Sequence, residues 1–203
     1  MRYKWLYKNN NNKLIVFFNG WGMDESVVKH LDPENNDVLM FYDYNSLDCD
    51  FDFDLLDKFS EINLIAWSMG VMTATLFDIK YNKKIAVNGT LKPIDNEFGI
   101  PIKIYELTLN NFNINSAEKF ISNMFDSKTK IEKIHRDFTE LKTELASLKT
   151  YKANTNFHYD RVIISSKDKI IPTKHQIAFW GISPNIDAGH APFLMFKKWS
   201  ELL

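Results

Sequence analysis

A chain of 203 residues, 45% of them apolar and 14% aromatic, has enough hydrophobic side chains to fill the core of one compact domain. Its 25 basic and 26 acidic side chains nearly cancel, which excludes the broad positive field of a protein that binds nucleic acid or an anionic membrane. Cys49 is the only cysteine, so an intramolecular disulfide and a four-cysteine zinc site are also excluded. No apolar stretch is long enough to span a bilayer, and the N-terminus lacks the apolar run of a secretion signal, so we expect a cytoplasmic protein.

The first ninety residues alternate apolar runs with polar or amphipathic segments. Four apolar runs have the length and composition of buried strands, at residues 14–18, 38–42, 62–67 and 84–88. Helices are expected between them, at residues 24–31, in the acidic stretch that ends near residue 60, and at 69–80. This alternation predicts an α/β fold, in which helices cover both faces of a mostly parallel sheet.

The pattern changes between about residues 91 and 156. Pro93, Gly99 and Pro101 favour loops there, and two stretches with helical spacing of apolar residues follow, at 116–125 and 131–151. Beyond them the expected elements are a strand at 161–165, a short strand at 182–186 and a final helix at 192–203. The sequence therefore predicts a single domain over residues 1–203, with a helical cap insertion at approximately 91–156.

A predicted strand passes into a predicted helix at Ala66, Trp67, Ser68, Met69 and Gly70. The nucleophile elbow of the α/β-hydrolase fold lies at such a junction. It requires small residues on both sides of the serine, because the sharp turn packs helix backbone against strand backbone. Gly70 meets this requirement, and Ala66 stands where glycine is usual. The pattern predicts that Ser68 is the nucleophile of a serine hydrolase with the α/β-hydrolase fold.

A serine hydroxyl attacks efficiently only when a base removes its proton and an acid orients that base. His190 lies between the last predicted strand and the final predicted helix. Asp168 follows the strand at 161–165, in a loop at the carboxyl edge of the sheet. The chain order of serine, acid and histidine is the one that this fold uses. We therefore predict that Ser68, His190 and Asp168 are the catalytic residues.

Other acids and histidines in the chain are less suited to the same roles. Asp160 precedes its strand and is expected at the opposite edge of the sheet, and Asp187 is too near His190 in sequence to orient its ring easily. The fold specifies no role for the remaining histidines, which we expect to be structural or exposed: His30, His135, His158 and His175. The acidic stretch at 48–57 is expected to be a solvated loop and helix start rather than a metal site.

Attack on an acyl group creates an oxyanion, which needs two hydrogen-bond donors. Met69 supplies the first through its backbone N–H at the start of the helix. The second is expected from the loop after the first core strand, at Gly20, Trp21 and Gly22. We predict the backbone N–H of Trp21, with Gly22 as the alternative.

Four segments together carry a resemblance to a known family. They are Phe17 to Met23, Ala66 to Gly70, Val87 to Pro101 and Gly189 to Phe193. These segments resemble the BioG-type pimeloyl-[acyl-carrier protein] methyl ester esterases of biotin synthesis, and the likeness spans nearly the whole chain. Two positions depart from the wider hydrolase pattern, because Asn19 stands where a histidine is often found and Ala66 replaces a glycine.

The resemblance implies a reaction and a partner. Ser68 would attack the methyl ester of a pimeloyl chain carried on acyl carrier protein, methanol would leave with a proton from His190, and water would release the acyl group. The implied product is pimeloyl-[acyl-carrier protein], formed with no metal or organic cofactor. The insertion would contact this acidic carrier through an apolar slot and a basic rim. The slot is expected at Phe120, Met124 and Phe125, and the rim at Lys119, Lys133 and Arg136.

Two other functions remain open at this point. One is a carboxylesterase or thioesterase of broad specificity for small acyl esters, and the other is a hydrolase-like binding protein without activity. We expect the protein to be a monomer.

Overall fold

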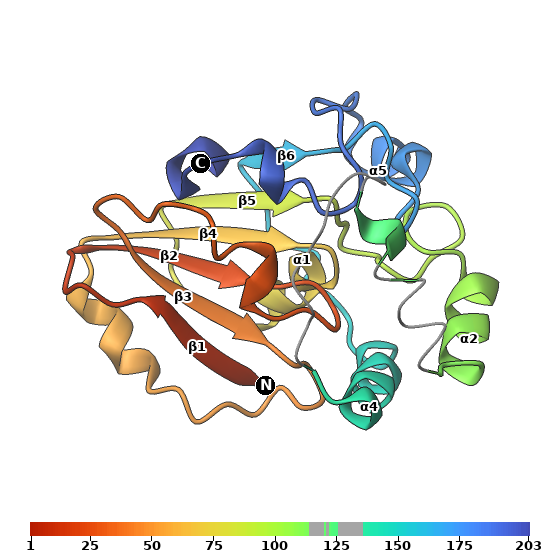
Figure 1. Cartoon of the computed structure of the whole chain (residues 1–203), viewed down its shortest axis with the longest axis horizontal. Helices are drawn as coiled ribbons and strands as arrows, with labels where there is room; N and C mark the ends of the chain where they lie inside the picture. Colours follow the sequence, from red (N-terminus) through yellow and green to blue (C-terminus); the bar gives the residue numbers. More distant parts are fainter. Residues whose placement is uncertain (114–119, 121, 126–135) are drawn as a thin grey trace.

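The computed structural model describes residues 1–113, 120, 122–125 and 136–203. A six-stranded sheet in the order β1-β3-β2-β4-β5-β6 forms its centre (Figure 1). The strands are β1 (Arg2–Tyr7), β2 (Lys13–Phe18), β3 (Asp37–Tyr42), β4 (Glu61–Trp67), β5 (Lys83–Val87) and β6 (Arg161–Ile163). β1 pairs with β3 in the antiparallel direction, and all other pairs are parallel. This confirms the predicted α/β-hydrolase fold with its mostly parallel sheet.

Both faces of the sheet are buried, which explains why its central strands are continuous apolar runs. Leu14, Val16 and Phe18 of β2 belong to one core cluster, and the alternate residues Ile15 and Phe17 belong to a second on the opposite face. The first face is covered by α1 (Met69–Thr73), and the second by the 3-10 turns η1 (Glu25–Val27), η4 (Phe193–Met195) and η5 (Trp199–Leu202). Other 3-10 turns are η2 (Phe53–Lys58) and η3 (Ala74–Leu76).

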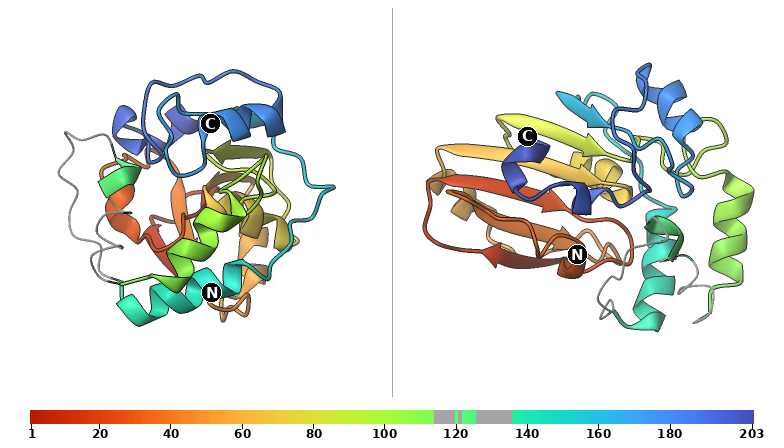
Figure 2. Two further views of the ribbon diagram at one scale, coloured as in Figure 1. Left: turned by 90° about the vertical axis from the view of Figure 1, so that its right-hand side faces the viewer. Right: turned by 45° about the horizontal axis from the view of Figure 1, so that its top comes forward.

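Three further helices lie at the end of the sheet where the parallel strands terminate (Figures 1 and 2). They are α2 (Ile102–Asn110), α4 (Phe138–Leu148) and α5 (Thr173–Trp180). α2 and α4 are placed between β5 and β6 in the chain, inside the segment predicted as an insertion. The buried Tyr105 hydroxyl of α2 donates to the Leu145 carbonyl of α4 at 2.7 Å. Within the described ranges, every helix is too short or too polar to cross a membrane.

Strand β1 and helices α2 and α5 were not predicted. β1 is an edge strand whose apolar side chains alternate with Arg2 and Lys4, so it lacks the apolar run of the buried strands. Pro101 and Pro172 favour loops, but each occupies the N-cap position immediately before a helix. A proline at the start of a helix removes no intrahelical hydrogen bond, because its N–H would be unpaired there in any case.

The helix predicted at 69–80 is much shorter in the structure. The Thr73 hydroxyl donates to the Met69 carbonyl at 3.3 Å, and the Thr75 hydroxyl donates to the Met72 carbonyl at 2.7 Å. Such side-chain bonds compete with the helical pattern. The chain then becomes extended at Phe77, whose ring packs 5.6 Å from that of Phe18 in the core.

The helix predicted at 131–151 begins later, at Phe138. Asp137 caps it, since its carboxylate accepts hydrogen bonds from the backbone N–H groups of Thr139 and Glu140 at 2.8 and 3.2 Å. Residues 131–135 lie outside the described part of the chain, as do residues 116–119 and 121 of the helix predicted at 116–125.

Two predictions near the C-terminus were wrong. The strand expected at 182–186 is only an isolated bridge between Ser165 and Ile186, because Pro184 lacks the N–H that a ladder requires. The helix expected at 192–203 is divided into η4 and η5 by an extended stretch in which the Lys197 carbonyl accepts from the Asp32 N–H at 2.9 Å.

Gly70 lies where α1 approaches the end of β2, and this contact generates a prediction. A Cβ atom at Gly70 would lie 2.3 Å from the Phe18 carbonyl oxygen, whereas one at Gly181 would meet nothing within 4 Å. We expect Gly70→Ala to lower the free energy of unfolding by about 3 kcal/mol through overpacking. Gly181→Ala should cost about 1 kcal/mol, because Gly181 has a φ of +70°. Urea denaturation measures both, and equal losses would contradict the close backbone approach.

Candidate active site

Ser68 occupies the turn between β4 and α1, as predicted. Its φ of 57° and ψ of −121° lie in a region that a residue with a side chain rarely adopts. The surrounding backbone holds this conformation, because the Ser68 N–H donates to the Val87 carbonyl at 3.0 Å and the Ser68 carbonyl accepts from Val71 at 3.1 Å. Ala66 is fully buried, paired with Phe18 in β2 and Ala86 in β5. The strained turn and its small neighbours are the features of a nucleophile elbow.

His190 joins Ser68 to Asp168 through two hydrogen bonds. Its Nε2 lies 2.8 Å from the Ser68 Oγ, and its Nδ1 lies 2.7 Å from the Asp168 Oδ2. Because the Asp168 carboxylate only accepts hydrogen bonds, Nδ1 carries the proton and Nε2 is left to accept the Ser68 O–H. The imidazole is fully buried. The structure thus brings together the three residues that the sequence identified as catalytic.

Asp168 is held in place by three further donors. Its Oδ1 accepts from the backbone N–H groups of Ile170 and Ile171 at 2.8 and 3.1 Å. Its Oδ2 also accepts from the side-chain amide of Gln176 at 2.8 Å. Gln176 belongs to α5 and was missed because that helix was not predicted.

Asn88 fixes the backbone around His190 and was also not assigned a role from the sequence. Its amide donates to the His190 carbonyl at 2.9 Å and to the Ser165 Oγ at 2.7 Å, and its Oδ1 accepts from the Ser165 N–H at 2.7 Å. The Trp67 indole donates to the same His190 carbonyl at 2.8 Å. A polar residue directly after the buried strand β5 was the available signal. Asn88 therefore ties the end of β5 to the segments that carry Asp168 and His190.

The competing acids lie elsewhere. Asp160 accepts from the Lys84 backbone N–H at 2.8 Å at the start of β6, which is the opposite end of the parallel sheet. Asp187 is exposed and pairs with Lys167 at 2.8 Å. Among the histidines, the Nδ1 of buried His175 lies 2.7 Å from the Gly99 carbonyl, and the Nε2 of His30 lies 3.0 Å from the Phe193 carbonyl. His158 is exposed, and His135 lies outside the described residues.

A cavity of about 280 Å³ opens beside Ser68. Its walls come from α2, α4, the loop after β2 and the segment after Asp168. The lining residues are Trp21, Ser68, Met69, Ile100, Ile104, Tyr105, Leu107, Thr108, Asn111, Phe120, Asn123, Met124, Leu145, Lys169 and Ile170. Among them, Lys169 alone carries a charge, so the cavity suits a largely apolar chain.

Trp21 and Met69, the predicted oxyanion donors, both line this cavity. Within the part of the chain that the structure describes, neither backbone N–H donates a hydrogen bond to another residue. The Trp21 side chain is anchored, because its indole donates to the Leu141 carbonyl of α4 at 3.0 Å and its ring lies 4.8 Å from that of Phe120. Two backbone donors therefore border the cavity that contains the Ser68 hydroxyl.

The fold is that of the α/β-hydrolase class, to which esterases of known structure belong. The same fold is found in an esterase from Exiguobacterium antarcticum, with a TM-score of 0.65, 12% identity, and coverage of 95% of this chain and 89% of that one. A lipase-esterase related protein from Clostridium acetobutylicum matches with a TM-score of 0.65, 13% identity, and coverage of 95% and 92%.

The family model of the pimeloyl-ACP methyl esterase BioG matches residues 1–202, so the chain belongs to the BioG family. The crystal structure of BioG from Haemophilus influenzae superposes with a TM-score of 0.88 at 34% identity, covering 100% of this chain and 99% of that one. A malonyl-[acyl-carrier protein] O-methyltransferase from Bacteroides fragilis is 38% identical over 178 residues, which are 82% of this chain and 36% of that protein.

The residues expected to contact a carrier protein lie in different parts of the structure. Phe120 and Met124 line the cavity beside Ser68, whereas Phe125 packs against the core cluster on the second face of the sheet. Lys119 and Lys133 lie outside the described residues. The expected role of Arg136 was wrong. Its side chain is only 3% exposed, so it cannot form part of a basic rim.

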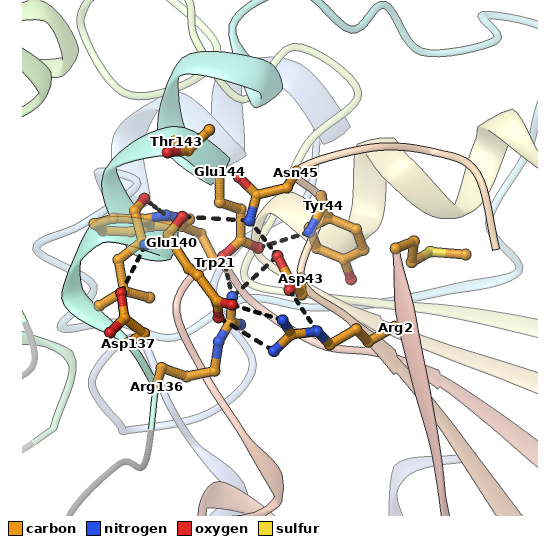
Figure 3. A network of polar contacts seen from close by, with 12 residues as sticks. Arg2, Trp21, Asp43, Tyr44, Asn45, Arg136, Asp137, Glu140, Thr143 and Glu144 are labelled. Carbon is orange, nitrogen blue, oxygen red and sulfur yellow. Dashed lines mark hydrogen bonds and ion pairs between the residues drawn. The ribbon is translucent and has the colours of Figure 1, made fainter. Parts of the chain in front are cut away.

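Arg136 instead belongs to a buried network of charges between α4 and the sheet (Figure 3). Its Nη2 lies 3.1 Å from the Asp43 carboxylate and 3.0 Å from the Glu144 carboxylate. Burial raises the pKa of Glu144 to about 7, although the charge of Arg136 opposes this shift. Asp43 is far from Arg136 and Glu144 in the sequence, so no local pattern predicted that the three residues would meet.

The raised pKa of Glu144 makes stability depend on pH. The folded protein binds more protons than the unfolded chain between the ordinary pKa of 4.5 and about 7. The protonated carboxyl therefore contributes its full stability below pH 4.5, and this contribution is lost as the pH rises through about 7. We expect the unmodified protein to lose stability from pH 5 to pH 8 as Glu144 ionises, whereas Glu144→Gln has no such group. The urea midpoint of Glu144→Gln minus that of the unmodified protein should therefore increase over this range. A constant difference across this range would refute the raised pKa.

Proposed function

We propose that the protein is a serine esterase that hydrolyses the methyl ester of pimeloyl-[acyl-carrier protein] methyl ester. The observation that carries this proposal is the buried chain of hydrogen bonds from Ser68, which lines an apolar cavity, through His190 to Asp168. Membership of a family described as pimeloyl-ACP methyl esterases supports the choice of substrate. The proposed products are pimeloyl-[acyl-carrier protein] and methanol.

The first half of the proposed reaction forms an acyl-enzyme. His190 Nε2 takes the proton of the Ser68 hydroxyl while Oγ attacks the ester carbonyl carbon. The resulting oxyanion accepts hydrogen bonds from the backbone N–H groups of Met69 and Trp21. Asp168 stabilises the imidazolium that forms. The carbon–oxygen bond to the methoxy group then breaks, and methanol leaves with the proton from His190.

The second half releases the acid. Water loses a proton to His190 as it attacks the acyl carbon of the Ser68 ester, and a second oxyanion forms between the same two donors. When this intermediate collapses, Ser68 Oγ leaves and recovers a proton from His190. The carboxyl group of the pimeloyl chain is then free, and the enzyme returns to its starting state.

The cavity supports an acyl chain as the bound group. Most of its lining is apolar, with side chains from α2, from Leu145 of α4 and from the loop after β2, and this matches the methylenes of a pimeloyl chain. We propose that the chain is one domain in which the segment at approximately 91–156 acts as a cap over Ser68. Acyl carrier protein is the proposed partner, since the family is described as acting on pimeloyl-ACP.

Purified protein should release methanol from pimeloyl-[acyl-carrier protein] methyl ester and should also cleave a small aryl ester. Ser68→Ala should stay folded and lose both activities by about three orders of magnitude or more, because no other group replaces its hydroxyl. His190→Ala should lose nearly as much, and the double variant no more than either.

Two outcomes would count against this proposal. A Ser68→Ala variant that retains more than about a tenth of the activity would exclude Ser68 as the nucleophile. Cleavage of free methyl pimelate as efficiently as the carrier-linked ester would favour an esterase of broad specificity.

Asp168→Ala should reduce kcat less than Ser68→Ala, because the attacking pair remains and only the orientation and charge support of the imidazole are lost. Asp160→Ala is the matched control, since it removes the same carboxylate from the opposite end of the sheet. Kinetics on the aryl ester, measured together with thermal unfolding, compare the two. A greater loss of kcat in Asp160→Ala at equal stability would mean that the acid has been misassigned.

A further inference from the structure

Helix α4 is connected to the loop that would bind the oxyanion at two separate points. We define this oxyanion loop as residues 19–21. The first connection is direct, because the Trp21 indole donates to the Leu141 carbonyl of α4 at 3.0 Å. The second runs through Tyr44, which follows β3 and lies fully buried between α4 and the loop.

The second connection is a continuous series of hydrogen bonds. The Glu144 carboxylate of α4 accepts from the Tyr44 backbone N–H at 3.0 Å, and the Tyr44 hydroxyl donates to the Asn19 carbonyl at 2.7 Å. The Asn19 side chain in turn accepts from the Gly20 N–H at 2.9 Å. Glu144, Tyr44 and Asn19 are each inaccessible to solvent. This series ends one peptide before the Trp21 N–H.

Charged neighbours fix the Glu144 carboxylate in this position. Arg136 binds it at 3.0 Å and also binds Asp43 at 3.1 Å, so one guanidinium joins α4 to the residue before Tyr44 (Figure 3). The same guanidinium lies 5.5 Å from the centre of the Tyr42 ring. Outside this buried set, Arg2 pairs with both Asp43 and Glu140 near the surface. Glu144 thus has one cationic and one backbone donor, and both come from outside its helix.

Oxyanion stabilisation is sensitive to the position of its donors. A donor acts only when it lies about 2.7–3.1 Å from the oxygen in the transition state, and loss of one donor typically lowers kcat by about 10²–10³. The ground-state carbonyl oxygen is bound much less strongly by the same groups. A displaced loop should therefore lower kcat and the affinity for tetrahedral adducts, while KM changes little.

We propose that Glu144 and Tyr44 are positioning residues for ester hydrolysis, holding the Trp21 N–H at the distance from Ser68 that the oxyanion requires. This inference rests on the function proposed above. Neither side chain lines the cavity. Both act through the Asn19 carbonyl, so the helix that forms one wall of the acyl site also sets the geometry of the donor.

Kinetics on a small aryl ester test the proposal with two variants. Tyr44→Phe removes the hydroxyl bond to Asn19 at constant shape, and Glu144→Leu removes the acceptor for the Tyr44 N–H. Each variant should lower kcat about tenfold and change KM by no more than about twofold. This is the effect expected when one oxyanion donor is displaced but not removed. Affinity for a trifluoromethyl ketone, which forms a tetrahedral adduct with serine, should fall by the same factor. Glu144→Gln retains an acceptor for Tyr44 and should stay within about threefold of the unmodified kcat.

Matched controls separate positioning from a general loss of packing. Glu140→Gln changes the same residue type one turn earlier on α4, where the carboxylate pairs with partly exposed Arg2. Tyr7→Phe removes a tyrosine hydroxyl of strand β1, which donates to the Leu31 carbonyl at 3.2 Å. Both controls should retain the kcat of the unmodified protein. Since Tyr44→Phe and Glu144→Leu break the same series, the double variant should lose much less than the product of the two factors.

The possible results distinguish this proposal from the proposed function. Unchanged kcat in folded Tyr44→Phe, or a loss of kcat with no loss of ketone affinity, would overturn the positioning role. An equal loss in the controls would overturn it as well. If Glu144→Leu does not fold, Tyr44→Phe decides the question alone. Should Ser68→Ala remain active in the same assay, the proposed function itself fails, whatever the positioning variants do.

Discussion

The arrangement of the site depends on one close contact between backbones. α1 begins so near the end of β2 that the Phe18 carbonyl oxygen would lie 2.3 Å from any Cβ at position 70. Glycine at this position lets the chain turn sharply after β4, and the turn holds Ser68 in a strained conformation with φ 57° and ψ −121°. Because β2 and β4 are neighbours in the sheet, the same contact puts the loop after β2 beside the serine. The positions of Ser68 and of the loop after β2 therefore follow from a single packing constraint.

Helix α4 extends this constraint from the sheet to the helices beside the cavity. It supplies Leu145 to the cavity wall, accepts the Trp21 indole at Leu141, and buries Glu144 against Arg136 and Tyr44. A buried charge network of this kind contributes little net stability, because desolvation offsets most of the attraction. Its hydrogen bonds have strict geometry, however, and they hold the helix, the end of β3 and the oxyanion loop in one fixed relation. Positional accuracy is thus a better explanation of these charges than stability.

The nearly equal numbers of basic and acidic residues give no sign that some of these charges are buried. The chain has a formal net charge of −1, yet Arg136 and Glu144 are both withdrawn from solvent. Arg136 was predicted in a basic rim because the carrier protein implied by the resemblance is acidic, yet its side chain is buried. Only the tertiary structure brings Asp43 from the end of β3 and Glu144 from α4 to either side of its guanidinium. The pKa of Glu144 is raised for the same reason, since burial is a property of the folded arrangement.

The sequence by itself determined the parallel core of the sheet, the strand-to-helix turn at Ser68, and the loops that carry Asp168 and His190. These features depend on local patterns: continuous apolar runs for strands buried on both faces, small residues at a sharp turn, and polar residues just after strands. The tertiary structure alone decided the contacts of Asn88 with the His190 segment and the connection from Glu144 through Tyr44 to the loop after β2. Each of these depends on partners that are distant along the chain, because a buried polar group is satisfied by whichever donor or acceptor the packed fold places beside it.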